Sequence, residues 1–259
     1  MRWVLLCWAL GAGATQALSA QDRAAALRLV QAYPAHLGGV EGDELIWKDG
    51  TRMPLRRANA PTYVSLLNAP GLLNQLDTRY PACAPLRTPA RNEDPGRVRY
   101  EPLFRKMYGG TPQEVQRHLV AVNWFGQRLL VTQVNGAAAS LRQVAGDLAR
   151  RPHLLPYARP SAGTFLWRKV ARTPRLSVHA FGAAIDLNTA QSNYWQWEGY
   201  AEGQAGIRYR NRMPAELVHL FERRGWIWGG RWYHHDTMHF EYRPELTQAC
   251  GPLTPSAGR

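Results

Sequence analysis

The sequence predicts an α+β fold with a mainly antiparallel sheet and helices packed on it. Helical and strand patterns follow one another without the regular alternation that a parallel sheet requires. Asp49-Gly50 separates two short strand-like runs, which is a strong signal for an antiparallel hairpin. The chain has 259 residues and shows no repeating period, so it is long enough for one core with a small appendage.

The first 20 residues have the pattern of a secretory signal peptide. Arg2 precedes an apolar run from Trp3 to Ala14, and small residues follow up to Ala20. The run is too short to span a bilayer comfortably, and no later stretch is long and apolar enough. We therefore expect cleavage near residue 20 rather than a membrane anchor, and a periplasmic or secreted protein that is a monomer.

Residues 21–110 are predicted to form an N-terminal region with a hairpin and a proline-rich loop. Along Gln21–Tyr33 an apolar stripe of Ala24, Leu27 and Val30–Tyr33 indicates a short helix that buries this stripe, and Pro34 ends the helix. The hairpin joins a strand at Glu44–Lys48 to one at Thr51–Met53. Four prolines and no periodicity make Pro81–Pro95 a loop.

Residues 111–250 are predicted to form a larger second region, followed by a tail at 251–259. Its first helix begins at Thr111, where an N-cap, a proline and a glutamate form a capping box. Asn135-Gly136 turns the chain between a strand and a helix. The pattern predicts strands at Gln127–Val134, Thr164–Val170, Ala183–Asn188 and Thr237–Tyr242, and helices at Ala137–Arg150 and from Met213 to Gly225.

Two cysteines remain once the predicted signal peptide is removed together with Cys7. Cys83 and Cys250 form an even pair in a chain bound for an oxidising compartment. A disulfide between them would tie the N-terminal region to the end of the second region. Two unpaired buried thiols remain the alternative.

The chain is basic, with 32 lysines and arginines, 19 acidic residues and a formal net charge of +13. An exported protein meets several polyanions, including phospholipid surfaces and carboxylate-bearing peptides. The charge is spread along the chain, and no recognition-helix or aromatic-basic motif accompanies it. The balance supports an anionic partner, and we expect that partner not to be nucleic acid.

The most informative stretch runs from Ser177 to Asn188. Gly182 permits a sharp change of backbone direction after His179. Strand alternation then places Asp186 in an otherwise apolar strand. A buried carboxylate must be paired, hydrogen-bonded or coordinated to a metal, so Asp186 is a candidate ligand.

A second stretch, Asp236–Tyr242, supplies the partners. Alternation puts His239 and Glu241 on one face of a strand. If this strand neighbours the first, His239 and Asp186 converge, and His179 completes three ligands of a catalytic zinc site with an open fourth position. Spacing alone also allows an alternative without a metal, in which the two histidines are structural and Asp186 pairs with an arginine.

Other polar residues near His239 have predicted roles. Asp236 lies three residues earlier and can act as the base for the attacking water. Glu241 can hydrogen-bond to the free ring nitrogen of His239, or remain a solvated charge. His234 and His235 are weaker alternatives as metal ligands. Five tryptophans line a cleft or pack in the core: Trp195, Trp197, Trp226, Trp228 and Trp232.

Together these stretches resemble a known enzyme family. The patterns are S-x-H-x-x-G-x-A-x-D and then W-G-G-x-W with D-x-M-H-F-E. They are similar to the zinc D-alanyl-D-alanine carboxypeptidases and L-alanyl-D-glutamate endopeptidases, whose fold is shared with the Hedgehog signalling domain. The resemblance is specific from Gly163 to Leu246. The stretch from Asn92–Arg97 to Tyr108-Gly109 also looks like the segment that precedes the metal region in exported members.

The resemblance implies one Zn²⁺ per chain, held by His179, Asp186 and His239, in a catalytic domain at residues 111–250. It implies that Asp236 is the acid/base residue and that an arginine upstream of His179 holds the substrate or stabilises its developing oxyanion. Arg168 is the candidate for that role and Arg175 competes with it. The implied substrates are peptidoglycan stem peptides.

The aspartate at position 236 modestly favours an endopeptidase, because many carboxypeptidase members have glutamate there. A catalytically silent module that only binds wall peptides is the alternative function.

Overall fold

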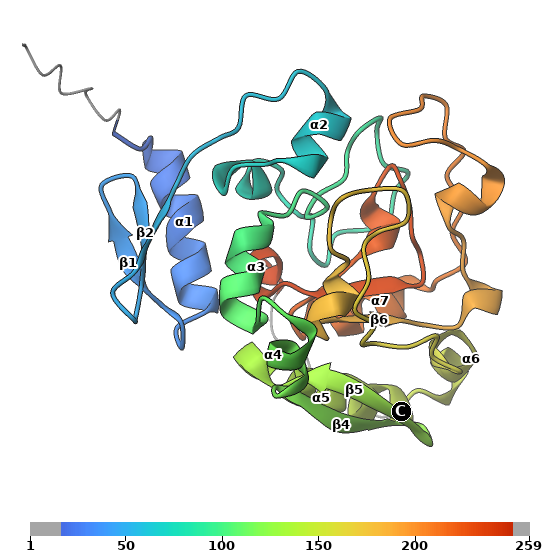
Figure 1. Cartoon of the computed structure of the whole chain (residues 1–259). Helices are drawn as coiled ribbons and strands as arrows, with labels where there is room; N and C mark the ends of the chain where they lie inside the picture. Colours follow the sequence, from blue (N-terminus) through green and yellow to red (C-terminus); the bar gives the residue numbers. More distant parts are fainter. Residues whose placement is uncertain (1–16, 251–259) are drawn as a thin grey trace, which may run out of the picture.

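The structure is a computed structural model that describes residues 17–250. It combines helices with three small antiparallel sheets, which confirms the α+β class (Figure 1). Most of the predicted signal peptide and the predicted tail at 251–259 lie outside the described residues. Within residues 17–250, no helix combines the length and apolar character needed to cross a bilayer. The Hedgehog-like topology and the division at residue 110 stay predictions.

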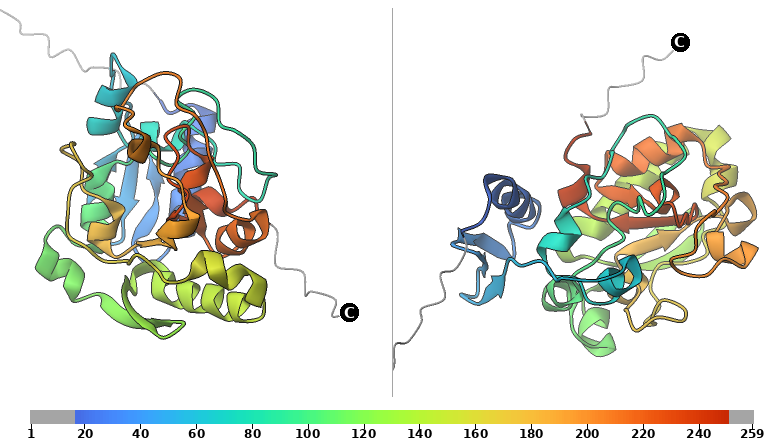
Figure 2. Two further views of the ribbon diagram at one scale, coloured as in Figure 1. Left: turned by 90° about the vertical axis from the view of Figure 1, so that its right-hand side faces the viewer. Right: turned by 90° about the horizontal axis from the view of Figure 1, so that it is seen from above.

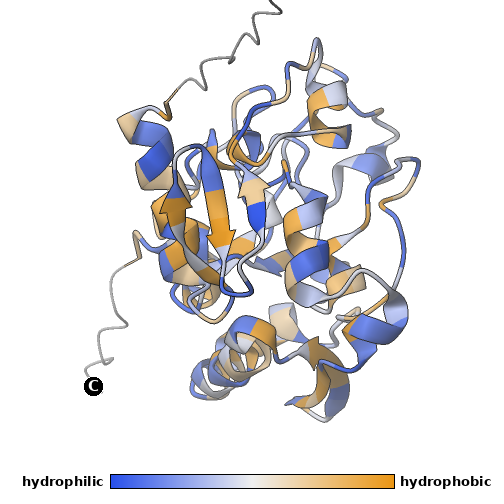
Figure 3. Cartoon of the chain, turned by 60° about the vertical axis from the view of Figure 1, so that its left-hand side comes forward, coloured by the Kyte–Doolittle hydropathy of each residue, from blue (hydrophilic) through white to orange (hydrophobic). Residues whose placement is uncertain are grey.

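The N-terminal helix and the first sheet pack together at one side of the molecule (Figures 1 and 2). Helix α1 spans Ala20–Ala32, and the sheet holds β1 (Leu37–Glu41), β2 (Glu44–Trp47) and β3 (Arg52–Pro54) in that order. The pairing of β2 with β3 confirms the hairpin predicted from Asp49-Gly50. β2 is hydrophobic in Figure 3, and the turn after it is hydrophilic.

A middle segment connects this unit to the rest of the chain. It contains α2 (Tyr63–Asn68), a 3-10 turn η1 (Leu73–Leu76) and α3 (Glu101–Tyr108), and the proline-rich stretch between them has no helix or strand, as predicted. Phe104 of α3 packs on Phe181, with the ring centroids 5.7 Å apart. The middle segment thereby joins the core around α1 to the chain beside His179.

The second sheet pairs β4 (Leu119–Trp124) with β5 (Gln127–Thr132). Helix α4 before it covers only Pro112–Gln116. Its N-cap is Thr111, whose hydroxyl accepts a hydrogen bond from the Glu114 N–H. Helix α5 (Ala137–Ala149) follows a 3-10 turn η2 (Val134–Gly136) and packs against β4.

The third sheet carries the candidate site. Its strand order is β6, β8, β7, with β6 at Ala184–Asp186, β7 at Trp226–Trp228 and β8 at His239–Tyr242. The prediction of a strand at Thr164–Val170 is wrong, because this stretch makes only one isolated bridge, from Lys169 to Leu176. The remaining elements are η3 (Pro152–Leu154), α6 (Leu155–Ala158), η4 (Val178–Phe181), η5 (Thr189–Gln191), η6 (Trp195–Glu198), α7 (Ala215–Glu222), η7 (Gly229–Arg231) and α8 (Pro244–Thr247).

Two apolar clusters hold the third sheet in place. One contains Ile185 and Phe240 with residues of α5 and α7, and the other contains Phe181 and Ala184 with residues of α1 and α3. Trp226 and Trp228 are fully buried in the first cluster, so of the two predicted alternatives they pack in the core. The strands that carry the polar site residues are thus fixed by packing on both sides.

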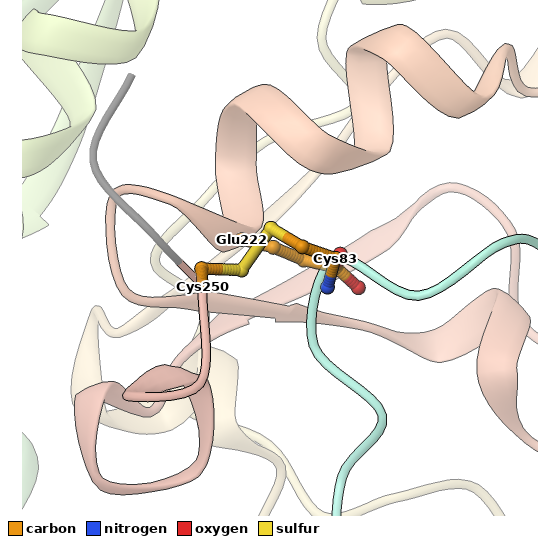
Figure 4. Close-up of side chains that lie close together, drawn as sticks. All are labelled: Cys83, Glu222 and Cys250. Carbon is orange, nitrogen blue, oxygen red and sulfur yellow. A yellow bond between two sulfur atoms is a disulfide. The ribbon is translucent and has the colours of Figure 1, made fainter. Parts of the chain in front are cut away.

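The predicted disulfide between Cys83 and Cys250 is present (Figure 4). It joins the proline-rich loop to the chain after α8. Glu222 lies beside it and accepts a hydrogen bond from the Cys83 N–H at 2.7 Å. Because the two sulfurs are bonded to each other, this cluster offers no thiolate to a metal.

Loss of the disulfide is expected to destabilise the protein. Replacing both cysteines with serine should lower the free energy of unfolding by about 2–5 kcal/mol, since the cross-link closes a long loop of the unfolded chain. Urea unfolding of the variant and the wild type measures the difference. Wild-type protein treated with reductant should shift in the same direction, and an unchanged midpoint in both samples would contradict the prediction.

Candidate metal centre

Three polar side chains meet at one edge of the third sheet. Asp186 at the end of β6 lies directly opposite His239 at the start of β8 in the register. His179 reaches the same point from η4. The His239 Nδ1 lies 2.8 Å from Asp186 Oδ1 and 3.1 Å from His179 Nε2, and His179 Nε2 lies 3.2 Å from Asp186 Oδ2.

The local sequence explains how His179 reaches this point. Ser177 caps η4 by accepting a hydrogen bond from the His179 N–H. Gly182 ends the turn with φ +64°, and a Cβ there would lie 2.4 Å from Leu119 Cδ2. The glycine therefore allows the chain to pass close to β4 and enter β6 with Asp186 facing His179.

Hydrogen bonds fix the orientation of both imidazole rings. His179 Nδ1 lies 2.6 Å from the Thr164 carbonyl oxygen, and His239 Nε2 lies 2.9 Å from Glu241 Oε1. An oxygen acceptor at these positions requires each of these ring nitrogens to donate its hydrogen. In the neutral rings the other nitrogens, His179 Nε2 and His239 Nδ1, therefore turn their lone pairs toward each other.

The charge balance at this point favours a cation. Burial disfavours a charged imidazole, yet the carboxylates of Asp186 and Glu241 raise the pKa of His239 to about 10. Burial also disfavours a charged carboxylate, yet His179 and His239 hold the pKa of Asp186 well below its usual range. The cluster thus stabilises positive charge among its three facing atoms, and a metal ion supplies such charge.

The donor set fits zinc. Ligands arranged tetrahedrally about zinc at 2.0–2.1 Å lie about 3.3 Å from one another. The facing atoms of the three side chains, with Asp186 Oδ1 toward His239 and Asp186 Oδ2 toward His179, are separated by 2.8 to 3.2 Å, close to that spacing. Two imidazole nitrogens and a carboxylate oxygen are also the ligand types of catalytic zinc, which keeps its fourth position for water or substrate. The three predicted ligands are therefore brought together as a metal site would require.

Glu241 contacts the candidate ligand His239 on the ring edge away from the other two ligands, and Arg99 pairs with Glu241. Glu241 is fully buried and is the partner predicted for His239. Arg99 Nε donates to Glu241 Oε2 at 3.0 Å, and the second guanidinium nitrogen pairs with Oε1. Despite burial, Arg99 and His239 hold the pKa of Glu241 well below its usual range. The carboxylate therefore stays ionised and keeps the His239 ring in its orientation.

Weakening this support is expected to weaken metal binding. Glu241→Gln should lower zinc affinity by roughly 10–100-fold, because the amide is a poorer acceptor and no longer balances Arg99. Competition with a fluorescent zinc chelator measures the change. Glu216→Gln on the exposed side of α7 is the matched control, and equal affinities of the two variants would contradict the prediction.

Asp236 lies beside the metal centre without joining it. The described group of mutually close donor atoms contains His179, Asp186 and His239 but not Asp236. Asp236 Oδ1 is shielded from solvent and has no hydrogen-bond partner among the described residues. Burial raises the pKa of Asp236 to about 7, with His239 opposing and Asp186 adding to the rise. A carboxyl group with such a pKa can exchange a proton near neutral pH.

A pocket of about 250 Å³ opens beside these groups. Asp186 and Asp236 line it, together with both arginines considered for substrate binding, Arg168 and Arg175. Arg175 donates to Glu202 at 3.0 Å. In contrast, Arg168 forms no ion pair with any carboxylate of residues 17–250, and its charge acts on Asp236. Arg168 is therefore the better placed of the two to meet a substrate.

The alternative ligands do not reach the metal centre. His234 is fully buried and its Nδ1 lies 2.6 Å from Asp94 Oδ2. His235 is buried away from the cluster and has no hydrogen-bond partner for either ring nitrogen among the described side chains. Of the loop tryptophans, Trp195 is buried and Trp197 is 57% exposed, and both line the pocket, as does Trp232.

Sequence reasoning missed three residues that build the pocket wall. Arg97 and Arg99 lie far before His179 in the chain, and Ser177 had no predicted role of its own. The one available signal was the similarity of residues 92–109 to a family segment. The structure shows that this segment contacts the site, since Asp94 accepts a hydrogen bond from the His234 N–H at 2.9 Å.

Comparison with protein families gives a match in the region of the candidate ligands. Residues 171–242 match the family model described as D-alanyl-D-alanine carboxypeptidase. The matched range contains all three candidate ligands and Asp236, which confirms the resemblance predicted from these residues. No curated protein sequence matches the chain.

Proposed function

We propose that the protein is an exported zinc peptidase of peptidoglycan stem peptides, because residues 171–242 match the family model described as D-alanyl-D-alanine carboxypeptidase. The observation that carries the proposal is the pair of imidazole nitrogens that face each other, with Asp186, at 2.8 to 3.2 Å. Asp236 and Arg168 on the wall of the adjoining pocket add the groups that hydrolysis needs.

The ligands His179, Asp186 and His239 would hold one Zn²⁺, which supplies a Lewis acid for amide hydrolysis. Asp236 takes a proton from the attacking water and returns it to the leaving amine. The Arg168 guanidinium stabilises the negative charge that develops on the carbonyl oxygen. Glu241 holds His239 in the tautomer that presents Nδ1.

Among the possible bonds, we favour the L-alanyl-D-glutamate bond over the terminal D-alanyl-D-alanine bond. The support is the aspartate at position 236, which endopeptidases of this family commonly have. Export is supported by the signal-peptide pattern at residues 1–20.

Muropeptide digestion tests the proposal. The chain without residues 1–20, loaded with zinc, is incubated with purified muropeptides and the products are weighed by mass spectrometry. We expect internal cleavage between L-alanine and D-glutamate. Loss of one D-alanine would instead assign a carboxypeptidase, and intact muropeptides that bind tightly would identify the silent binding module.

A further inference from the structure

Three arginines form a wall between the pocket beside the metal centre and a second pocket. Arg97, Arg99 and Arg175 line both cavities, and the second one has a volume of about 210 Å³. We name Arg97, Arg99 and Arg175 the arginine wall. The cavity beside the metal centre is the metal-side pocket, and the second cavity is the distal pocket. The three arginine side chains are only 8%, 15% and 11% exposed, so three guanidinium groups are largely removed from water at one place.

The carboxylates around the arginine wall are shared among several partners. Glu202 pairs with Arg97 at 2.7 Å and with Arg175 at 3.0 Å. Asp94 pairs with Arg97 at 3.4 Å, but it also accepts hydrogen bonds from His234. One carboxylate therefore serves two guanidinium groups, and Arg175 has no acid of its own.

Arg175 has hydrogen-bonding capacity to spare. Its Nε is shielded from solvent and makes no hydrogen bond to any of the described residues. Burial lowers the pKa of Arg175, and the charges of Arg97 and Arg99 lower it further. A buried N–H donor without an acceptor is costly, and an anion placed there would satisfy the donor and offset the repulsion.

The distal pocket has a different chemistry. Apolar side chains line it, among them Leu67, Leu176 and Phe104. Its acidic residue, Glu101, already pairs with Arg105 and accepts a hydrogen bond from the Leu176 N–H. The cavity thus suits an aliphatic chain, with the cationic arginine wall at its boundary with the metal-side pocket.

We propose that the arginine wall, and Arg175 above all, binds a carboxylate of an acidic peptide substrate that extends from the metal-side pocket to the distal pocket. This inference rests on the proposed function. It adds that the substrate must carry a carboxylate in addition to the scissile carbonyl group. Arg168 acts at the scissile carbonyl, and Arg175 holds a carboxylate away from it. Peptides in which that carboxylate is amidated are poor substrates.

Paired peptides test the inference. The probe is the stem pentapeptide L-alanyl-γ-D-glutamyl-L-lysyl-D-alanyl-D-alanine, compared with two forms amidated either at the D-glutamate α-carboxyl or at the C-terminus. For the wild type we expect one of the two amidations to lower kcat/KM by about tenfold to hundredfold, as the loss of a charge-assisted hydrogen bond predicts.

The variant Arg175→Ala identifies the residue responsible. The ratio of kcat/KM between the acid and amide forms should fall to near one, whereas Arg175→Lys should keep part of it. Arg172→Asn is the matched control, because Arg172 is exposed, lies outside both pockets and has φ +61°, which asparagine tolerates. A purely structural role for Arg175 would lower turnover of all three peptides equally, and that result would overturn the inference.

A binding measurement distinguishes a failure of this inference from a failure of the proposed function. Isothermal titration of zinc-loaded Asp236→Asn with the same peptides measures affinity without turnover. Tighter binding of the acid form by this variant, together with no cleavage of any of the peptides by the zinc-loaded wild type, supports the arginine wall and refutes the peptidase. Equal binding and equal cleavage of acid and amide forms refutes the arginine wall and leaves the peptidase standing.

Discussion

Replacing His239 with alanine is expected to abolish zinc binding at one equivalent per chain and to lower peptide hydrolysis by about a thousandfold or more. His239 supplies one of three facing donor atoms, and two ligands do not hold zinc in a defined geometry. The lost Lewis acid contributes several kcal/mol of transition-state stabilisation, which corresponds to a factor of this size. Metal content by mass spectrometry and initial rates on muropeptides measure both effects.

Chelation provides the same test without a mutation. Wild-type protein treated with a zinc chelator should lose activity and regain it when zinc is added back. His153→Ala, at an exposed histidine paired with Glu216, should keep the zinc and the activity. Full activity of the His239→Ala variant would show that the assigned metal centre is wrong.

The fold was predictable wherever local sequence signals act alone. The Asp49-Gly50 turn specified its hairpin, and the helix at Ala137–Ala149 matched its expected bounds to within a residue. In α1 the helix was correct but its buried face was not. Ala25 and Ala26 are buried and Leu27 is exposed, because small side chains let the helix lie close to the sheet.

Other elements depend on contacts that the sequence does not show. The stretch Thr164–Val170 has strand-like residues, yet it makes one isolated bridge at Lys169 and scattered hydrogen bonds, such as that from the Leu166 N–H to the His179 carbonyl, instead of a continuous ladder. β4 was missed since the capping signal at Thr111 suggested a longer helix, which the structure ends after Gln116. In both places tertiary packing overrode the local preference.

The candidate site was predictable to a greater degree than its surroundings. Strand alternation placed Asp186 and His239 on facing polar positions, and the observed register pairs them directly. The pocket wall was not predictable, because Arg97 and Arg99 lie in the loop before α3, and only folding brings them beside Asp236. Sequence patterns identify the residues of one short motif, whereas distant arginines carry no periodic signal.

Asp236→Asn is expected to lower kcat by about 100-fold to 10,000-fold while leaving the bound zinc in place. Asparagine has nearly the same shape as aspartate but cannot take up the proton of the attacking water. Asp236 is not among the mutually close donor atoms, so zinc content should stay at the wild-type level. Rates under saturating peptide and metal analysis of the same sample measure the two quantities together.

Asp236→Glu is the informative companion, because glutamate retains the proton-accepting group on a longer side chain. The backbone at this position is fixed by the Asp236 N–H, which donates to the Gly229 carbonyl at 3.0 Å, and by Gly229, where a Cβ would lie 2.6 Å from the Asp236 carbonyl oxygen. The longer carboxylate must therefore fold back toward the pocket, and we expect activity between those of the wild type and Asp236→Asn. If Asp236→Asn kept wild-type turnover, the base would lie elsewhere, and the buried, unpaired Oδ1 of Asp236 would need a structural explanation instead.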